Sequence, residues 1–231
     1  MLNKRGASSH LEVIISFTLF SMFVLSLLLY VNPYKTTTLP DTLLKNIQES
    51  FIENNSVELT KFFLLINKTH TGCIDVSIPS ELTLLGESRV FDSNGFLKIS
   101  EIGGNGIIID SSSNDFYVYL SPVFIAQTTG CTAADQINCG AGDCSIGSVQ
   151  NKKIVSETRI LSMKSNYETN YNNLKIQLGI PENVDFAIVS EEFGMEMYIP
   201  EDLEVISKSY STEVLYSNGD ILNKEFIFKI W

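Results

Sequence analysis

Four cysteines carry the most specific chemistry in this sequence: Cys73, Cys131, Cys139 and Cys144. An even number of cysteines is typical of disulfide-bonded proteins in an oxidising compartment, and four cysteines allow three pairings. A zinc site with four thiolate ligands is a competing interpretation, but the C-x7-C-x4-C spacing of the last three cysteines lacks the C-x2-C pairs of structural zinc sites. Free buried thiols are the third interpretation. We expect disulfides, and the sequence leaves their pairing open.

Residues that could catalyse a reaction are sparse. The histidines are His10 and His70, and neither belongs to a nucleophile or metal motif such as G-x-S-x-G or H-E-x-x-H. The adjacent Glu191 and Glu192 could form an acid–base pair of carboxylates, but neighbouring side chains of a strand point to opposite faces of a sheet. We therefore expect no enzyme activity, no cofactor and no bound metal.

Two sequons are candidate glycosylation sites. Asn54 begins the triplet Asn-Asn-Ser, and Asn67 begins the triplet Asn-Lys-Thr. Such triplets also occur by chance, and they matter only in a segment that leaves the cytoplasm. Asn67 is the better candidate, because we expect it at the end of a strand before a turn.

Outside these residues, the chain is organised around one uncharged apolar stretch, from Val13 to Val31. As a helix, its nineteen residues would be about 28 Å long, close to the ~30 Å hydrocarbon core of a bilayer. Lys4 and Arg5 precede the stretch and Lys35 follows it. Cytoplasmic flanks favour Lys and Arg, so we expect a transmembrane helix with its N-terminus in the cytoplasm and the rest of the chain outside.

The junction before this stretch has two interpretations. In the first, Ser9 and Glu12 form a capping box, in which each side chain accepts a hydrogen bond from a backbone N–H of the first turn. The second depends on the order of the parts: a basic segment, the small residues Gly6 and Ala7, one glutamate and an unbroken apolar helix. This order resembles the class III signal peptide of type IV pilin-like proteins, particularly the archaeal ones.

The resemblance covers residues 1–31 and implies both a processing step and an assembly contact. In that family a dedicated peptidase cuts before the apolar helix, which is kept, and a glutamate at position five of the mature chain helps assembly. Cutting after Gly6 would place Glu12 at position six, and cutting after Ala7 would place it at position five. Gly6 and Ala7 are thus the candidate processing junction, and Glu12 is the candidate assembly carboxylate. The alternative is an uncut signal anchor. A conventional cleaved secretory signal is disfavoured, because the apolar run exceeds the usual ~7–15 residues and no small-x-small cleavage pattern follows it.

Composition restricts the partners that the chain can bind. It has 16 Lys and Arg against 27 Asp and Glu, a net charge of -11 and an isoelectric point near 4.6. Such a surface repels phosphate backbones, so we expect no nucleic-acid binding. The expected partners are the membrane and, through the N-terminal helix, copies of the chain or other pilin-like subunits.

The stretch from 32 to 55 predicts a helical stalk. Asp41 can cap a helix in which Leu44, Ile47 and Phe51 recur at helical spacing. Residues 56–231 are expected to form one β-rich extracytoplasmic domain, behind a basic N-terminal segment and junction at 1–12 and the transmembrane helix at 13–31.

Within the β-rich domain, short runs of β-branched and aromatic residues between Gly, Asn, Asp and Ser indicate strands. The predicted strands are 57–66, 73–78, 96–99, 106–109, 116–120, 154–160, 184–189, 204–210, 213–216 and 226–230. Turns are predicted at 92–95 and 217–220, an exposed cysteine-bearing loop at 130–147, and a helix from Met163 to Gly179. The predicted fold class is α+β, mostly β, with antiparallel strands and one or two helices behind the N-terminal transmembrane helix.

Two functions of different classes remain open. The first is a pilin-like structural or surface-assembly subunit. The second is a signal-anchored surface protein that does not assemble and instead binds a ligand or a neighbouring cell. Both would place the protein in the cell membrane with its C-terminal domain outside the cell.

Overall fold

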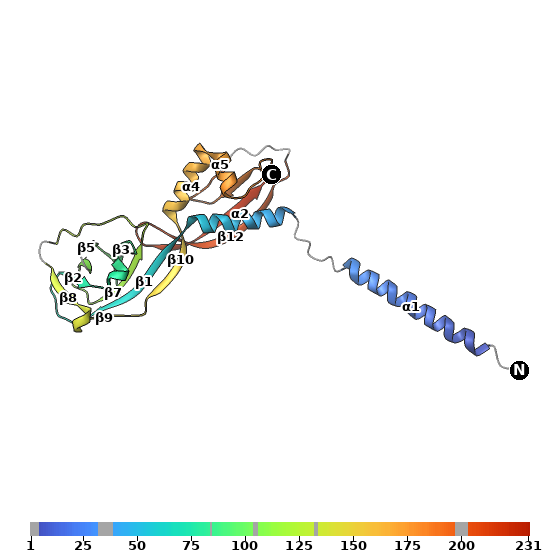
Figure 1. Cartoon of the computed structure of the whole chain (residues 1–231), viewed down its shortest axis with the longest axis horizontal. Helices are drawn as coiled ribbons and strands as arrows, with labels where there is room; N and C mark the ends of the chain where they lie inside the picture. The colour runs from blue at the N-terminus through green and yellow to red at the C-terminus, as the bar shows by residue number, and fades with distance from the viewer. Residues whose placement is uncertain (1–4, 32–38, 84, 104–105, 132–133, 197–202) are drawn as a thin grey trace. The chain divides into compact units, whose positions relative to one another are not determined.

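A computed structural model describes residues 5–31, 39–83, 85–103, 106–131, 134–196 and 203–231, and for 5–12, 27–31 and 83 it describes the backbone alone. The chain divides into two units, Met1–Thr42 and Leu43–Trp231 (Figure 1). Residues 1–4 and 32–38, which include Lys4 and Lys35, lie outside the described residues. Each unit is described by itself below.

The secondary structure alternates a few helices with many short strands. The helices are α1 (Arg5–Val31), α2 (Leu39–Asn55), α3 (Ser80–Thr83), α4 (Glu157–Thr169) and α5 (Tyr171–Gln177), with a short 3-10 helix η1 (Cys139–Ala141). The first strands are β1 (Ser56–Ile66), β2 (Cys73–Ser77), β3 (Glu87–Asp92), β4 (Leu97–Lys98), β5 (Ser100–Gly103), β6 (Gly106–Asp110) and β7 (Asp115–Ser121). The later strands are β8 (Asp135–Asn138), β9 (Cys144–Ile146), β10 (Gln150–Ser156), β11 (Phe186–Val189), β12 (Ile206–Leu215) and β13 (Ile221–Ile230).

The first unit contains the long helix α1. This helix begins at Arg5, so Ser9 lies inside it and the interpretation of Ser9 as its N-cap is wrong. Within the described residues, no helix combines the length and the hydropathy that a membrane span requires. Asp41 likewise lies in the first turn of α2, which begins at Leu39, rather than at its cap. A carboxylate in a first turn is favourable because the N-terminal end of a helix dipole is positive.

The second unit is built on a large, mostly antiparallel sheet. Its strands lie in the order β11-β13-β12-β10-β1-β7-β3-β4, and β9 also pairs with β1. Neighbouring strands are antiparallel except β10 and β12, which are parallel and share the pairs Val155–Val214 and Ser156–Leu215. A smaller sheet has the order β5-β6-β2-β8, with β2 and β8 parallel.

Two main hydrophobic clusters hold this unit together. In the first, helices α2, α4 and α5 lie beside the C-terminal strands (Figure 1) and pack on β11, β12 and β13. Leu44, Ile47 and Phe51 of α2 are buried in this cluster, and the Phe51 ring contacts Phe226 and Phe228. The apolar residues of the predicted stalk are therefore part of a core. The second cluster lies between β1, β3 and β7 of the large sheet and the strands of the small sheet.

The predicted fold class, α+β with mostly β structure, is confirmed. The predicted turn at 92–95 is also confirmed, because the Asp92 carboxylate accepts hydrogen bonds from the N–H groups of Asn94 (3.0 Å) and Phe96 (2.9 Å). Gly95 and Gly219, the glycines of the two predicted turns, have positive φ angles of 82° and 96°. Such angles are strained for a residue with a Cβ atom.

Several predicted boundaries are wrong. The strand predicted at 154–160 ends at Ser156, whose extended backbone precedes α4. The helix predicted to Gly179 is interrupted at Asn170, whose φ of -146° and ψ of 51° are not helical. The strands predicted at 204–210 and 213–216 are one continuous strand, β12, paired along its length with β13.

Candidate functional site

The candidate residues of the N-terminal segment all lie in α1. Gly6, Ala7 and Glu12 are helical in backbone, and their side chains lie outside the described part of the chain. From Val13 to Leu25 the apolar side chains that the structure describes are mostly exposed; Phe17 is 70% and Met22 is 68% exposed. Elsewhere in the fold, most of the phenylalanines are buried in hydrophobic clusters. The exposed side chains of α1 therefore form a long apolar helical surface.

The four cysteines form two disulfides, Cys73–Cys131 and Cys139–Cys144. The expectation of disulfides is confirmed, and the pairing left open by the sequence is resolved. The zinc interpretation is wrong, because a sulfur bonded to another sulfur is not a thiolate ligand. The interpretation as free thiols is wrong for the same four residues.

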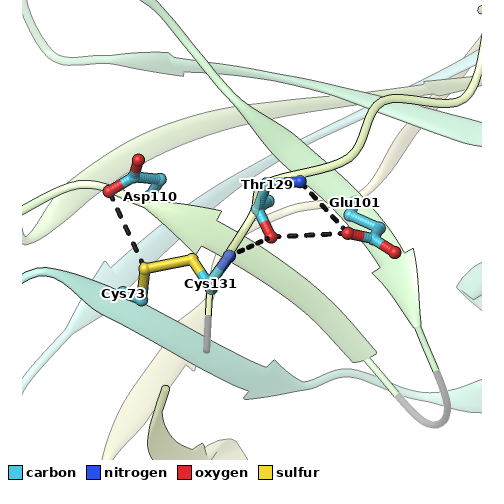
Figure 2. The surroundings of a disulfide bond; sticks show 5 residues. All are labelled: Cys73, Glu101, Asp110, Thr129 and Cys131. Carbon is cyan, nitrogen blue, oxygen red and sulfur yellow. Dashed lines mark hydrogen bonds between the residues drawn. A yellow bond between two sulfur atoms is a disulfide. The ribbon is translucent and has the colours of Figure 1, made fainter. Parts of the chain in front are cut away.

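The Cys73–Cys131 disulfide attaches an irregular segment to the small sheet (Figure 2). Cys73 begins β2 and pairs in register with Asp110 of β6, whose Oδ1 lies 3.8 Å from Cys73 Sγ. On the other side, the N–H of Thr129 donates to Glu101 Oε2 (3.1 Å), and the Cys131 N–H donates to Thr129 Oγ1 (3.4 Å). Asp110 and the two sulfurs lie close enough to suggest a metal site. The sulfur–sulfur bond removes two of those three ligands, so the arrangement is structural.

The Cys139–Cys144 disulfide closes a short loop around η1. The Asn138 side chain accepts a hydrogen bond from Gly140 N–H (2.9 Å), and Cys144, 4% exposed, pairs with Ile66 of β1. The segment 130–147 was expected to be an exposed loop, but its described part also contains β8 and β9. These strands pair with β2 and β1, so much of the segment belongs to the sheets.

Both candidate glycosylation residues are exposed, in different local structures. Asn54 lies in the last turn of α2, next to the buried Asn55. Asn67 follows β1; its backbone N–H donates to Asp143 O (2.8 Å) and its side-chain amide to Gly142 O (3.4 Å). Asn67 thus lies in a surface loop after a strand, as the sequence indicates, but its amide is already bound to the cysteine loop.

Of the candidate acid–base pair of glutamates, Glu192 contacts other residues. Glu192 accepts hydrogen bonds from Lys224 Nζ (2.8 Å) and Tyr216 Oη (2.6 Å), and the donation from Lys224 lowers its pKa. A lowered pKa keeps Glu192 ionised, whereas a general acid needs a raised one. Of the histidines, His70 contacts the Lys68 carbonyl oxygen through Nδ1 (3.3 Å), and the side chain of His10 lies outside the described residues.

A group of aromatic residues was not predicted from the sequence: Phe63, Phe91, Tyr117 and Tyr119, which we call the aromatic face. They come from β1, β3 and β7, three adjacent strands of the large sheet. The signal in the sequence was their alternation with core residues, because every second side chain of a strand points to the same face. That signal does not show which strands are neighbours.

Comparison with known proteins identifies no relative, since no family model, curated protein or solved structure matches the chain. The function is therefore inferred from the residues themselves.

Proposed function

We propose that the chain is a single-pass, membrane-anchored extracytoplasmic protein that assembles as a pilin-like structural subunit through its N-terminal helix. The observation that carries the proposal is the uncharged apolar run from Val13 to Val31, preceded by Lys4 and Arg5. The exposed apolar side chains from Val13 to Leu25 support it, because a surface of this kind needs an apolar environment such as lipid or a neighbouring helix.

The two disulfides support an extracytoplasmic location for the second unit. Disulfides persist in oxidising compartments and are rare where thioredoxin and glutathione keep thiols reduced. Both disulfides and the Asn67 sequon lie in the part of the chain that follows the apolar run. With Lys4 and Arg5 in the cytoplasm, that part would be outside the cell.

Glu12 gives the proposal a specific assembly contact. In a processed subunit the first residue carries a free α-amino group close to the start of the apolar helix. A carboxylate from a neighbouring copy would pair with this cation where little water is present. Removing one partner of a buried ion pair costs about 3–5 kcal/mol, because the other charge is left uncompensated.

The first test is the intact mass of the protein purified from its native host. Processing after Gly6 or Ala7 would remove six or seven residues and leave Glu12 in place. We expect one of these two masses, corrected for any glycan. A chain that retains Met1 would contradict processing and favour the signal-anchored surface protein that does not assemble.

The second test is cross-linking in native membranes, with and without the substitution Glu12→Gln. We expect Glu12→Gln to keep the protein in the membrane fraction and to remove the ladder of cross-linked oligomers. Glu53→Gln, which changes an exposed carboxylate on α2, is the matched control and should leave the ladder unchanged. Identical ladders for Glu12→Gln and the wild type would contradict the assembly contact.

A further inference from the structure

The aromatic face lies on the side of the large sheet that faces away from the second hydrophobic cluster. Along β1 and β7, Phe62, Leu64, Phe116 and Val118 are buried in that cluster, and the intervening residues point the other way. The solvated face of an antiparallel sheet normally carries polar residues. Here it carries four aromatic rings: Tyr117 is 48% exposed, Phe63 and Phe91 are half-buried, and Tyr119 packs against a third, smaller hydrophobic cluster.

The rings form two cross-strand pairs on three neighbouring strands. In register, Phe63 lies opposite Tyr117, and Tyr117 lies opposite Phe91. The ring centroids of Phe63 and Tyr117 are 5.3 Å apart, and those of Phe91 and Tyr119 are 5.2 Å apart. Cross-strand aromatic pairs also stabilise a sheet, which is the simplest reason for their presence. Stabilisation alone does not explain the hollows that surround these rings.

Two hollows flank the aromatic face and share Lys61, Tyr117 and Tyr119. One has a volume of about 390 Å³ and the other about 280 Å³. A wall of the larger hollow is the turn between β12 and β13, where Gly219 packs directly on Phe91. Gly219 has a φ of 96°, which is strained for a residue with a Cβ atom, and a Cβ atom there would lie 2.9 Å from Phe91 Cζ, so this wall favours glycine.

The polar groups around the rings are balanced in charge. Lys61 Nζ lies 4.7 Å from the centre of the Tyr119 ring, and Glu213 at the rim forms an ion pair with Lys152. Asp220 also lines the larger hollow, and Gln150 lines the smaller one. The charged residues that line the hollows are Lys61, Glu213 and Asp220. Lys152 lines neither hollow but neutralises Glu213, so the surface has donors and acceptors with no excess charge of either sign, which suits a neutral ligand.

We propose that the aromatic face binds neutral oligosaccharides. A pyranose ring presents a flat patch of C–H groups that packs on an aromatic ring, and hydroxyl groups around its edge that exchange hydrogen bonds with carboxylates, amines and amides. An open aromatic surface with polar groups at its rim matches both properties. Nucleic-acid bases also stack on aromatic rings, but the net charge of -11 opposes a phosphate backbone. This inference concerns a different part of the chain from α1 and does not depend on the assembly proposed above.

The test is a titration of the full chain, solubilised in a detergent without a sugar headgroup, since alkyl glycosides would compete for the site. The probes are cellotetraose, maltotetraose and chitotetraose, and binding is followed by calorimetry and by saturation transfer to the sugar protons. We expect at least one of them to bind. Tyr117→Leu keeps an apolar side chain but removes the ring, and it should weaken binding by about tenfold or more. Tyr117→Phe keeps the ring and should retain most of the affinity.

Phe96→Leu is the matched control, because Phe96 is an aromatic residue that is 66% exposed and lines neither hollow. It should bind like the wild type. The proposal is overturned if none of the three sugars binds to the wild type at 10 mM, a concentration at which even weak (~1 mM) sites are occupied. Equal affinities for Tyr117→Leu and the wild type would also overturn it. A decaproline peptide that binds through Tyr117 while the sugars do not would assign the face to peptides instead.

Discussion

The two disulfides should differ in how much they stabilise the fold, and the structure gives the size of the difference. Cys73–Cys131 joins residues 58 positions apart, whereas Cys139–Cys144 joins residues 5 positions apart. A disulfide restricts the unfolded chain, and the restriction grows with the logarithm of the loop length. At ~25 °C this relation gives about 4 kcal/mol for the long loop and about 2 kcal/mol for the short one.

The perturbation is a pair of double variants, Cys73→Ala with Cys131→Ala and Cys139→Ala with Cys144→Ala. The two loops do not overlap in sequence, so their contributions should add, and reduction of both disulfides in the wild type should cost about 6 kcal/mol. Cys144 is 4% exposed, so its replacement by alanine also removes a buried sulfur. The lost packing lowers the stability of the short-loop variant further, so the expected difference in stability between the two variants becomes smaller.

The assay is urea unfolding of the full chain followed by far-ultraviolet circular dichroism, with Trp231 fluorescence as a second signal. Trp231 exchanges backbone hydrogen bonds with Asp185 and reports on the end of the domain that contains β11 and β13. We expect the urea concentration at the unfolding midpoint to fall further for the variant without Cys73–Cys131 than for the variant without Cys139–Cys144. Equal losses of stability, or a larger loss for the variant without Cys139–Cys144, would contradict the dependence on loop length. A change in circular dichroism without a change in Trp231 fluorescence would show that the two clusters unfold separately.

Three further substitutions test individual contacts. Arg89, 4% exposed, donates to the carbonyl oxygens of Ser88 (2.7 Å), Ile125 (2.9 Å) and Ser217 (3.0 Å). Arg89→Lys cannot reach all three, so it should cost about 2–3 kcal/mol in urea unfolding, and a loss below ~0.5 kcal/mol would contradict this role. Burial raises the pKa of Tyr171 to about 12, so the folded state retains this proton while the unfolded state releases it near pH ~10. Stability should fall as the pH rises from about 10 to about 12, and Tyr171→Phe should make that fall shallower; an unchanged slope would contradict the assignment. The hydrogen bond from Lys98 lowers the pKa of Asp92 in the folded state. Ionised Asp92 therefore stabilises the fold at pH values above its pKa in the unfolded chain, and this stabilisation is lost as the pH falls through its pKa in the folded state. The stability difference between Asp92→Asn and the wild type should therefore be larger at pH 7 than below pH ~3, and the opposite order would contradict the ion pair with Lys98.

Local patterns predicted those parts of the fold that depend on local physics. Strand β1 was predicted at 57–66 and lies at Ser56–Ile66, because its alternating residues pack one face in the core. The end of β10 was missed, since Ile154 and Val155 favour a strand while Ser156 introduces the helix that follows. The polar residues at 211–212 separated two predicted strands, but β12 continues across these positions because it pairs with β13 along its whole length. Strands β8 and β9 are too short to recognise alone and depend on distant partners.

The candidate sites also combine features that the local sequence predicts with features that depend on which strands are neighbours. Cysteine number and spacing favoured disulfides, but the pairing depends on which strands are neighbours. The aromatic face could not be recognised for the same reason, because its rings come from β1, β3 and β7 and become one surface only through the sheet order. Its wall comes from still further along the chain, at Gly219.

Arg89 connects the stability of the domain to the aromatic face. The second cluster and the C-terminal hairpin of β12 and β13 are joined by a short parallel ladder of two residue pairs between β10 and β12. A third hydrophobic cluster, which includes Leu59 and Leu215, and the ion pair between Lys152 and Glu213 also join them. Arg89 adds a further connection, because its side chain holds Ser217 in the turn that forms a wall of the larger hollow. Arg89 lies opposite Tyr119 in the strand register and does not line that hollow, so we expect it to affect a ligand by positioning the turn. If the wall contributes to sugar binding, Arg89→Lys should lower both the stability measured by urea unfolding and the affinity for oligosaccharides. Loss of the Cys139–Cys144 disulfide should lower the stability alone.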